Sequence, residues 1–334
     1  MRIAVDAVGG DFIPKSPVEG ALEALAERPD LSIVLVGPED LIALELAKYD
    51  YDRERVIVQH APEIIQMHDS PTKVAKTKPN SSMHIGLGLH KKGEVNGFVS
   101  AGNTGALLAI STVILGRLEG VLRPTIASVF PTVNGFRMLV DAGANLEVKP
   151  EFLYQFGIMG KIYAENILNV SDAKIGILNV GEEEGKGTEV LKEAYTLLKS
   201  VQGFVGNIEG RDILPNNADV FVCDGLVGNI TLKFGESIAT SLQNMIKASI
   251  VRNKLNEDQA YLVSKVLRDA LSPFDYQLVG GVPFLGVNGV SLVGHGSSNA
   301  TAIKNMIFAA IKCVEKDVNA QITAALKLTL GFDE

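Results

Sequence analysis

Residues 1–37 have the sequence MRIAVDAVGGDFIPKSPVEGALEALAERPDLSIVLVG, and this stretch decides the fold class. Residues 3–8 and 32–36 are short apolar runs rich in Ile and Val, which favour β-strands. Between them Ser16 and Glu19 have the spacing of a capping box, with Pro17 at the first helical position of an amphipathic stretch. A strand, a helix and a second strand in this order predict a βαβ unit of a parallel sheet.

The same alternation continues along the chain. Further strands are predicted at residues 55–59, 97–100, 126–132, 137–141, 175–180, 204–208 and 220–223. Helices are predicted from Pro38, whose next residues are acidic, and over residues 150–168 and 188–199. We therefore expect an α/β fold with a mainly parallel sheet, formed as one unit over residues 1–330 or as two lobes.

Residues 230–272 carry a different pattern. Over 230–251 and 257–271 apolar side chains recur at spacings of three and four, which predicts a helical hairpin turning at 253–256. Three interpretations of its apolar stripes stay open: core packing, a homo-oligomer seam, and contact with a membrane surface. We favour core packing, because such a stripe usually faces the core of its own protein.

Composition excludes several classes of protein. The chain has 334 residues and a formal net charge of −8, which argues against nucleic-acid binding through a broad basic face. Its two cysteines, Cys223 and Cys313, are too few for a disulfide framework and are expected to be buried free thiols. The first residues lack the apolar segment of a signal peptide, so we expect a cytoplasmic protein.

The 33 glycines gather at strand ends together with Asp, Asn, Glu and Ser. Ligands of open α/β sheets bind at the carboxyl ends of the strands, where backbone N–H groups and helix N-termini favour anions. We identify seven such clusters, at residues 6–11, 100–106, 141–145, 179–188, 206–212, 223–229 and 286–299.

These clusters supply the candidate residues for binding phosphate and substrate. They are Asp6, Gly9, Gly10, Asp11, Ser100, Gly102, Asn103, Thr104, Gly105, Asp141, Asn145, Glu182, Asn207, Glu209, Arg211, Asn288, Gly296, Ser297, Ser298 and Asn299. Purely structural interpretations compete with these assignments: tight turns at Gly9 and Gly10, helix capping at Asn103 or Thr104, and a solvated Lys186.

No covalent nucleophile or metal site is indicated. The 179–188 cluster has the wrong spacing and too many glutamates for a P-loop, although Lys186 can still bind one small anion. His60, His68, His84 and His90 lack metal-ligand spacing, so we interpret them as structural and expect neither a metal nor a cofactor. The inventory suits a reaction whose nucleophile comes from a substrate, with the protein supplying positioning and oxyanion stabilisation.

Taken in order along one chain, the seven clusters resemble the bacterial phosphate acyltransferase family of phospholipid synthesis, the PlsX family. The resemblance implies an α/β/α sandwich like that of phosphotransacetylases and isocitrate/isopropylmalate dehydrogenases, with the helical hairpin protruding from it. The implied reaction converts acyl-[acyl carrier protein] and inorganic phosphate to acyl phosphate and free carrier. Implied partners are a second copy in a homodimer, the membrane surface and a downstream glycerol-phosphate acyltransferase.

This chemistry assigns roles to five candidate catalytic residues. Lys186, helped by the helix N-termini at Asn103-Thr104 and Ser297-Ser298, would hold phosphate, and Asn229 would stabilise the tetrahedral oxyanion. Asp224 and Glu183 would orient hydrogen-bond donors, and His295 would protonate the leaving thiolate.

Three alternatives remain. The first is a short-chain phosphotransacetylase-like enzyme that uses a coenzyme A thioester. The second is a dehydrogenase of related architecture, which the absence of a Gly-x-Gly-x-x-Gly motif disfavours. The third is a non-catalytic protein that binds the carrier or acts as a membrane scaffold.

Overall fold

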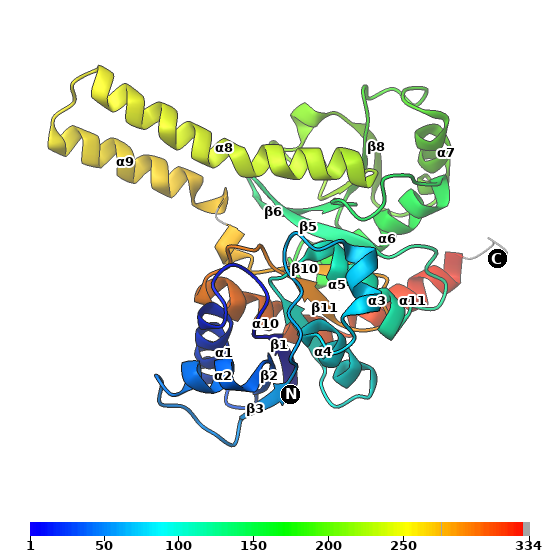
Figure 1. Cartoon of the computed structure of the whole chain (residues 1–334). Coiled ribbons are helices and arrows are strands. Elements are labelled where there is room, and N and C mark those ends of the chain that lie inside the picture. The colour runs from blue at the N-terminus through cyan, green and yellow to red at the C-terminus, as the bar shows by residue number, and fades with distance from the viewer. Residues whose placement is uncertain (275, 330–334) are drawn as a thin grey trace.

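The computed structural model describes residues 1–274 and 276–329, and in this part of the chain eleven strands form one continuous sheet (Figure 1). The strand order is β3-β2-β1-β4-β11-β10-β5-β6-β9-β7-β8. The strands are β1 (Arg2–Asp6), β2 (Ser32–Gly37), β3 (Val56–His60), β4 (Gly97–Ser100), β5 (Thr125–Thr132), β6 (Gly135–Val140), β7 (Ile175–Leu178), β8 (Phe204–Ile208), β9 (Val220–Val222), β10 (Val282–Leu285) and β11 (Ser291–Val293).

Helices cover both faces of this sheet. They are α1 (Lys15–Glu27), α2 (Glu39–Leu46), α3 (Pro71–Thr77), α4 (Ser82–Lys91), α5 (Thr104–Leu115), α6 (Pro150–Asn166), α7 (Glu189–Leu198), α8 (Gly225–Arg252), α9 (Glu257–Leu271), α10 (Ala300–Glu315) and α11 (Val318–Thr329). The expected α/β/α sandwich is therefore confirmed. The last residue of the expected unit, residue 330, lies outside the described residues.

The sheet is mainly parallel, as expected, and its antiparallel pairs meet in the middle. β5 pairs antiparallel with β6 and with β10, and β10 pairs antiparallel with β11. The sequence analysis did not identify β10 and β11, because both are short and lie in a stretch rich in glycine. These two strands bring the C-terminal part of the chain between β4 and β5, so that both halves share one sheet.

The core has a separate layer for each group of helices. On one face of β1 and β2, α1 and α10 bury Val18 and Ile307 against Ile3 and Leu35. On the opposite face, α4 and α5 bury apolar side chains against Phe98 of β4. A third cluster lies between α6, α7, α11 and strands β6, β7 and β9.

The starts predicted for α2, α6, α7 and α9 agree with the structure, whereas α8 begins at Gly225, five residues before the predicted start at 230, and α1 also begins elsewhere. Helix α1 begins at Lys15 after Pro14, with no side-chain cap, and Ser16 is buried inside it. The Ser16 N–H already donates to the carbonyl of Phe12, so the chain is helical before Ser16 can cap it. The capping-box prediction at Ser16 and Glu19 is therefore wrong. The helix predicted over 188–199 is α7, whose N-cap Thr188 accepts from the N–H of Leu191.

Helices α8 and α9 form the expected hairpin, which extends away from the sheet (Figure 1). Our favoured interpretation, core packing, is wrong for its apolar stripes: α9 buries no residue, and α8 buries only Gly225, Gly228 and Gly235 in the described structure. Met245 is 66% exposed and Tyr261 is 70% exposed, because the outer hairpin has no facing element within the described chain. Among the described helices, none combines the length and the apolar character needed to cross a membrane.

Candidate functional site

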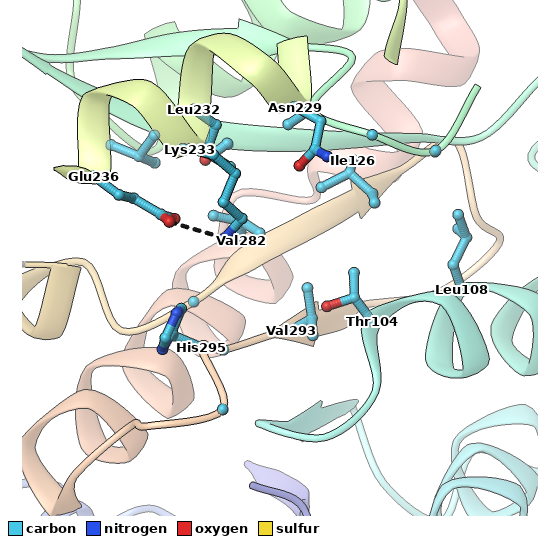
Figure 2. A pocket seen from close by; sticks show the side chains of 18 of the residues that line it. Thr104, Leu108, Ile126, Asn229, Leu232, Lys233, Glu236, Val282, Val293 and His295 are labelled. Carbon is cyan, nitrogen blue, oxygen red and sulfur yellow. Dashed lines mark hydrogen bonds and ion pairs between the residues drawn. The ribbon is translucent and has the colours of Figure 1, made fainter. Parts of the chain in front are cut away.

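A cavity of about 910 Å³ lies between α8 and the centre of the sheet. Its walls come from the start of α5, the first half of α8, strands β5, β10 and β11, and the loops around Asp11, Met67 and Gly143. Figure 2 shows Asn229 and Lys233 entering from α8 on one side, and Thr104 and His295 lying on the other. The cavity therefore joins segments from both halves of the chain.

Helix α8 reaches the cavity because small residues face the sheet. A side chain at Gly228 would collide with the backbone carbonyl of Asp141, and a Cβ at Gly235 would lie 2.6 Å from the ring of Phe130. Glycine at both positions lets the helix cross directly over β5 and the turn after β6. Residues 229, 233 and 236 follow one another at helical spacings of four and three, so they share the neighbouring face of α8 and line the cavity.

Asp224 begins α8 as its N-cap. One oxygen of its carboxylate accepts from the N–H groups of Leu226 and Val227, both at 2.9 Å. These bonds use the carboxylate to fix the start of the helix. Asp224 is absent from the cavity lining, so it orients Asn229 only through the helix.

The start of α5 forms the opposite wall. Asn103 caps the helix by accepting from the N–H of Ala106, and its amide donates to the carbonyls of Met67 and Asp69 at 3.0 Å. The buried side chain of Asn103 thereby connects α5 to the loop before α3, whereas Thr104 and Gly105 line the cavity. In the described structure no acceptor contacts the backbone N–H groups of Thr104 and Gly105.

Two buried carboxylates hold the turns beside this cavity. Asp6 accepts a 2.6 Å hydrogen bond from the hydroxyl of Ser100 and one from the N–H of Val8, and it packs under Gly9. Burial raises the pKa of the Asp6 carboxyl above its ordinary value. Asp6 and Ser100 are almost fully buried, which indicates that they fix the turn over residues 6–11 from below.

The buried carboxylate of Asp141 fixes the turn after β6. Its oxygens accept from the N–H groups of Gly143, Ala144 and Asn145 and from the Asn145 amide, at 2.6 to 3.1 Å. Burial raises the pKa of Asp141, against the opposing effect of these hydrogen bonds. Residues 142–144, not Asp141, line the cavity, so the carboxylate is a positioning group.

The loop after β11 joins the turn over residues 6–11. The Asp11 N–H donates to the carbonyl of Gly296 at 2.8 Å, and Asp11, His295 and Gly296 line the cavity. Nδ1 of His295 lies 2.7 Å from the hydroxyl of Ser297 and 3.2 Å from its backbone nitrogen, so Ser297 holds the imidazole in place. Ser298 donates its hydroxyl to the His295 carbonyl, and Asn299 caps α10 by accepting from Ala302. Both of these side chains therefore stabilise the loop.

Lys186 lies in a different place from the cavity. It belongs to a polar cluster after β7 and β8, where its ammonium is 3.9 Å from Glu183 and Arg211 is 3.0 Å from Glu209. Asn207 donates to the carbonyl of Glu183, and Glu182 lies 3.5 Å from Arg211. The structure does not bring this cluster together with Thr104 and Asn229 in one cavity.

Asn288 is also remote from the cavity. It is exposed on the turn between β10 and β11, and its N–H donates to the carbonyl of Gly116, which caps the C-terminal end of α5. Thr104 is at the opposite end of the same helix. Asn288 and Thr104 are thus separated by about the length of α5, roughly 18 Å at 1.5 Å per residue.

The sequence analysis missed three charged residues of the cavity: Arg123 and, on α8, Lys233 and Glu236. The side chains of Lys233 and Glu236 form an ion pair of 2.8 Å (Figure 2). The signal that could have found Lys233 and Glu236 is helical spacing, since Lys233 lies four residues after Asn229 and so on the same face of α8.

The two cysteines are buried free thiols, as expected. Burial raises the pKa of Cys223 well above its ordinary value and that of Cys313 to about 12, so neither is a thiolate at neutral pH. No group of three potential metal ligands occurs among the described residues. The cavity therefore offers hydrogen-bond donors, one imidazole, cations and apolar surface, which suit binding an anion and polarising a carbonyl.

Comparison with known proteins places the chain among acyltransferases. The family model described as "Fatty acid synthesis protein" matches residues 1–321. A phosphate acyltransferase of Chlorobaculum parvum is 46% identical, over 98% of this chain and 99% of its own length. One from Halothermothrix orenii is 42% identical, over 100% of this chain and 99% of its own length.

Solved structures share the fold at low sequence identity. A phosphotransacetylase from Streptococcus pyogenes superimposes with a TM-score of 0.59 at 17% identity, covering 93% of this chain and 94% of that one. The EutD phosphotransacetylase from Staphylococcus aureus gives a TM-score of 0.60 at 14% identity, covering 95% and 94%. These likenesses concern the fold alone.

Proposed function

Since the chain belongs to the phosphate acyltransferase family, we propose that it takes its acyl group from acyl carrier protein and supplies acyl phosphate to phospholipid synthesis. Transfer of an acyl group to phosphate is the activity of the family. The carrier-bound fatty acyl donor and the use of the product are our proposal.

The observation that carries this proposal is the cavity itself, which combines a polar mouth with extended apolar walls. The apolar lining includes Leu108, Ile126, Val129, Phe130, Leu232 and Val282. Burying one CH₂ group stabilises a complex by about 0.8 kcal/mol, so a long acyl chain gains far more from these walls than an acetyl group does. Its volume of about 910 Å³ is near the upper end for small-molecule sites, which favours a fatty acyl donor.

The reaction needs no nucleophile from the protein. An oxygen of the phosphate dianion attacks the thioester carbonyl carbon, and a C–O bond forms as the carbonyl becomes a tetrahedral oxyanion. The oxyanion then collapses, the C–S bond breaks, and the thiolate leaves and takes up a proton. A thiol has a pKa of about 8.5, so the thiolate is a good leaving group and acid catalysis is only a modest aid.

Within the cavity, we assign Asn229 to the oxyanion and Thr104 with Gly105 to hydrogen bonding of the reacting groups. His295 is the imidazole of the cavity lining and is our candidate for protonating the thiolate. Lys186, the sequence-based candidate for holding phosphate, lies outside the cavity lining, and we keep it as an alternative cation.

The test is phosphate-dependent release of thiol from palmitoyl carrier protein, compared with acetyl coenzyme A. We expect release from the palmitoyl donor that increases with phosphate, and little from acetyl coenzyme A. Preference for acetyl coenzyme A would support the short-chain alternative, and tight carrier binding without release would support a scaffold. Asn229→Ala should lower kcat at least about tenfold, whereas Asn244→Ala, on the exposed part of α8, should not change it.

The exposed stripes of α8 and α9 support two further proposals. We propose that Leu242, Met245 and Leu262 meet a second copy of this chain in a homodimer, and that the hairpin also contacts the membrane near the downstream glycerol-phosphate acyltransferase. Met245→Asp should lower the sedimentation coefficient to that of a monomer, while Asn244→Asp, with the same added charge, should not. Vesicle flotation tests the membrane contact, and unchanged assembly of Met245→Asp would refute the dimer seam.

A further inference from the structure

Charged side chains are few in the cavity. In the described lining they are Asp11, Arg123, Lys233 and Glu236, together with the imidazole of His295. A dianion entering this space needs a cation, so the choice of phosphate-binding residue lies between Arg123 and Lys233. Neither residue was a candidate from sequence.

Arg123 is already engaged elsewhere. Its guanidinium lies 5.8 Å from the centre of the Phe152 ring, on the helix α6 that lies outside the cavity lining. A cation over an aromatic face is held by the ring, and this directs the charge of Arg123 toward α6.

Lys233 has the better position. It is one helical turn beyond Asn229 on the same face of α8, and Figure 2 shows its side chain extending into the cavity between α8 and β10. Across the cavity lie Thr104 and the N–H groups at the start of α5. Phosphate bound by Lys233 would therefore lie beside the residue assigned to the oxyanion and face further donors.

Glu236 is the present partner of Lys233, at 2.8 Å between Nζ and Oε2. The two side chains are 56% and 33% exposed, so solvent screens the pair and it is weak. A phosphate dianion carries more charge than the carboxylate and can replace it at the ammonium. Glu236 would then point away, held by no other group in the described structure.

We propose that Lys233 binds the acceptor phosphate, and that Glu236 occupies its ammonium until phosphate enters. The proposal rests on the proposed function, since it assigns the acceptor of that reaction. It commits to inorganic phosphate and not to the phosphodiester of the donor's pantetheine arm.

The experiment measures the KM for inorganic phosphate and the KM for palmitoyl carrier protein separately. We expect Lys233→Ala to raise the phosphate KM at least about tenfold with the donor KM within about twofold, and Lys233→Arg to restore most of the loss. Glu236→Gln should lower the phosphate KM by about threefold or more, because a competing and repelling carboxylate is removed.

Lys192→Ala is the matched control. Lys192 pairs with Glu189 at the same distance of 2.8 Å and the same separation of three residues, on α7 and outside the cavity lining. Its phosphate KM should equal that of the wild type. Titration calorimetry with inorganic phosphate alone should show binding to the wild type and to Lys192→Ala, and none to Lys233→Ala.

The outcomes separate this proposal from the function on which it rests. If the wild type releases no thiol in response to phosphate, the proposed function fails. If the wild type is active and Lys233→Ala keeps a normal phosphate KM, only the assignment of Lys233 fails. A rise confined to the donor KM would also overturn it, because the ligand would then be the donor's phosphodiester.

Discussion

Replacing Asp141 is the most informative single perturbation of this structure. Its carboxylate accepts five hydrogen bonds: from the N–H groups of Ile126, Gly143, Ala144 and Asn145, and from the Asn145 amide. Asp141→Ala leaves all five donors without this acceptor. Asp141→Asn keeps the three bonds to one oxygen and turns an NH₂ group toward the two donors of Asn145.

The expected magnitudes follow from this count. At about 1 kcal/mol for each backbone N–H group, Asp141→Ala loses about 4 kcal/mol, and removing the buried charge returns part of that, for a net loss of about 2–4 kcal/mol. On the same count of backbone N–H groups, Asp141→Asn loses the bond from Asn145, about 1 kcal/mol, with the same relief, for a net loss of about 0–1 kcal/mol. The alanine variant should therefore unfold more readily than the asparagine variant.

The pH dependence has a definite sign. Burial raises the pKa of Asp141 in the folded state, so the folded chain holds this proton more tightly than the unfolded chain. The contribution of Asp141 to the free energy of unfolding is then largest below the ordinary pKa of 3.8 and falls as the pH rises through the folded-state pKa. The stability gap between the wild type and Asp141→Asn should narrow as the pH rises.

The assay is urea unfolding followed by far-UV circular dichroism, because the chain contains no Trp. Asp50→Ala, at an exposed position, is the control and should match the wild type within about 0.5 kcal/mol. Thiol release should also fall in Asp141→Ala under conditions where it is folded, since residues 142–144 line the cavity. Equal stability of Asp141→Ala and wild type, or equal losses in the two variants, would refute this reasoning.

Three further predictions concern other sites. His90 accepts a hydrogen bond from the N–H of Val290, and burial lowers the pKa of its imidazole. Its contribution to the free energy of unfolding is therefore present above about pH 6.5 and is lost as the pH falls through the lowered pKa. Urea titrations between about pH 5 and about pH 8 should show this loss of stability in the wild type and not in His90→Gln. Burial raises the pKa of Asp6, so Asp6 contributes a loss of stability as the pH rises above 3.8. Asp6→Asn should remove this contribution from the pH dependence of the free energy of unfolding, and an unchanged pH dependence would contradict the prediction. Gly235→Ala should lower both the midpoint of thermal unfolding and the rate of thiol release, because overpacking against Phe130 costs about 1–3 kcal/mol and outweighs the gain in helix propensity. Gly88→Ala is the control: its new methyl group meets open space on α4, so it should raise the midpoint of thermal unfolding.

Much of the fold could be predicted from local patterns. The strand, helix and strand of residues 1–37, the strands at 97–100 and 204–208, and the hairpin of α8 and α9 all follow from periodicity and turn residues. Strands β10 and β11 were missed because they are short and glycine-rich. The prediction that the hairpin packs in the core was wrong. An apolar stripe indicates that one face of a helix is buried against a partner, but it does not identify that partner.

The candidate site was only partly predictable, as the fates of Asp11, Lys186 and Lys233 illustrate. Sequence located polar clusters at strand ends, and the structure brings Asp11, Thr104, Asn229 and His295 into one cavity. Sequence gave no reason to choose Lys233, since a lysine in an amphipathic helix is ordinarily solvated. Only the crossing of α8 over β5 turns this lysine toward the cavity.

By itself, then, the sequence determined the α/β class, most strands and helices, and the set of glycine and polar clusters, because these depend on interactions within a few residues. Only the tertiary structure decided which clusters meet. Lys186 follows β7, three strands from β5 in the sheet, which at about 4.8 Å per strand is a separation of about 14 Å. Strand order is set by contacts between distant segments, and these leave no periodic signal in the chain.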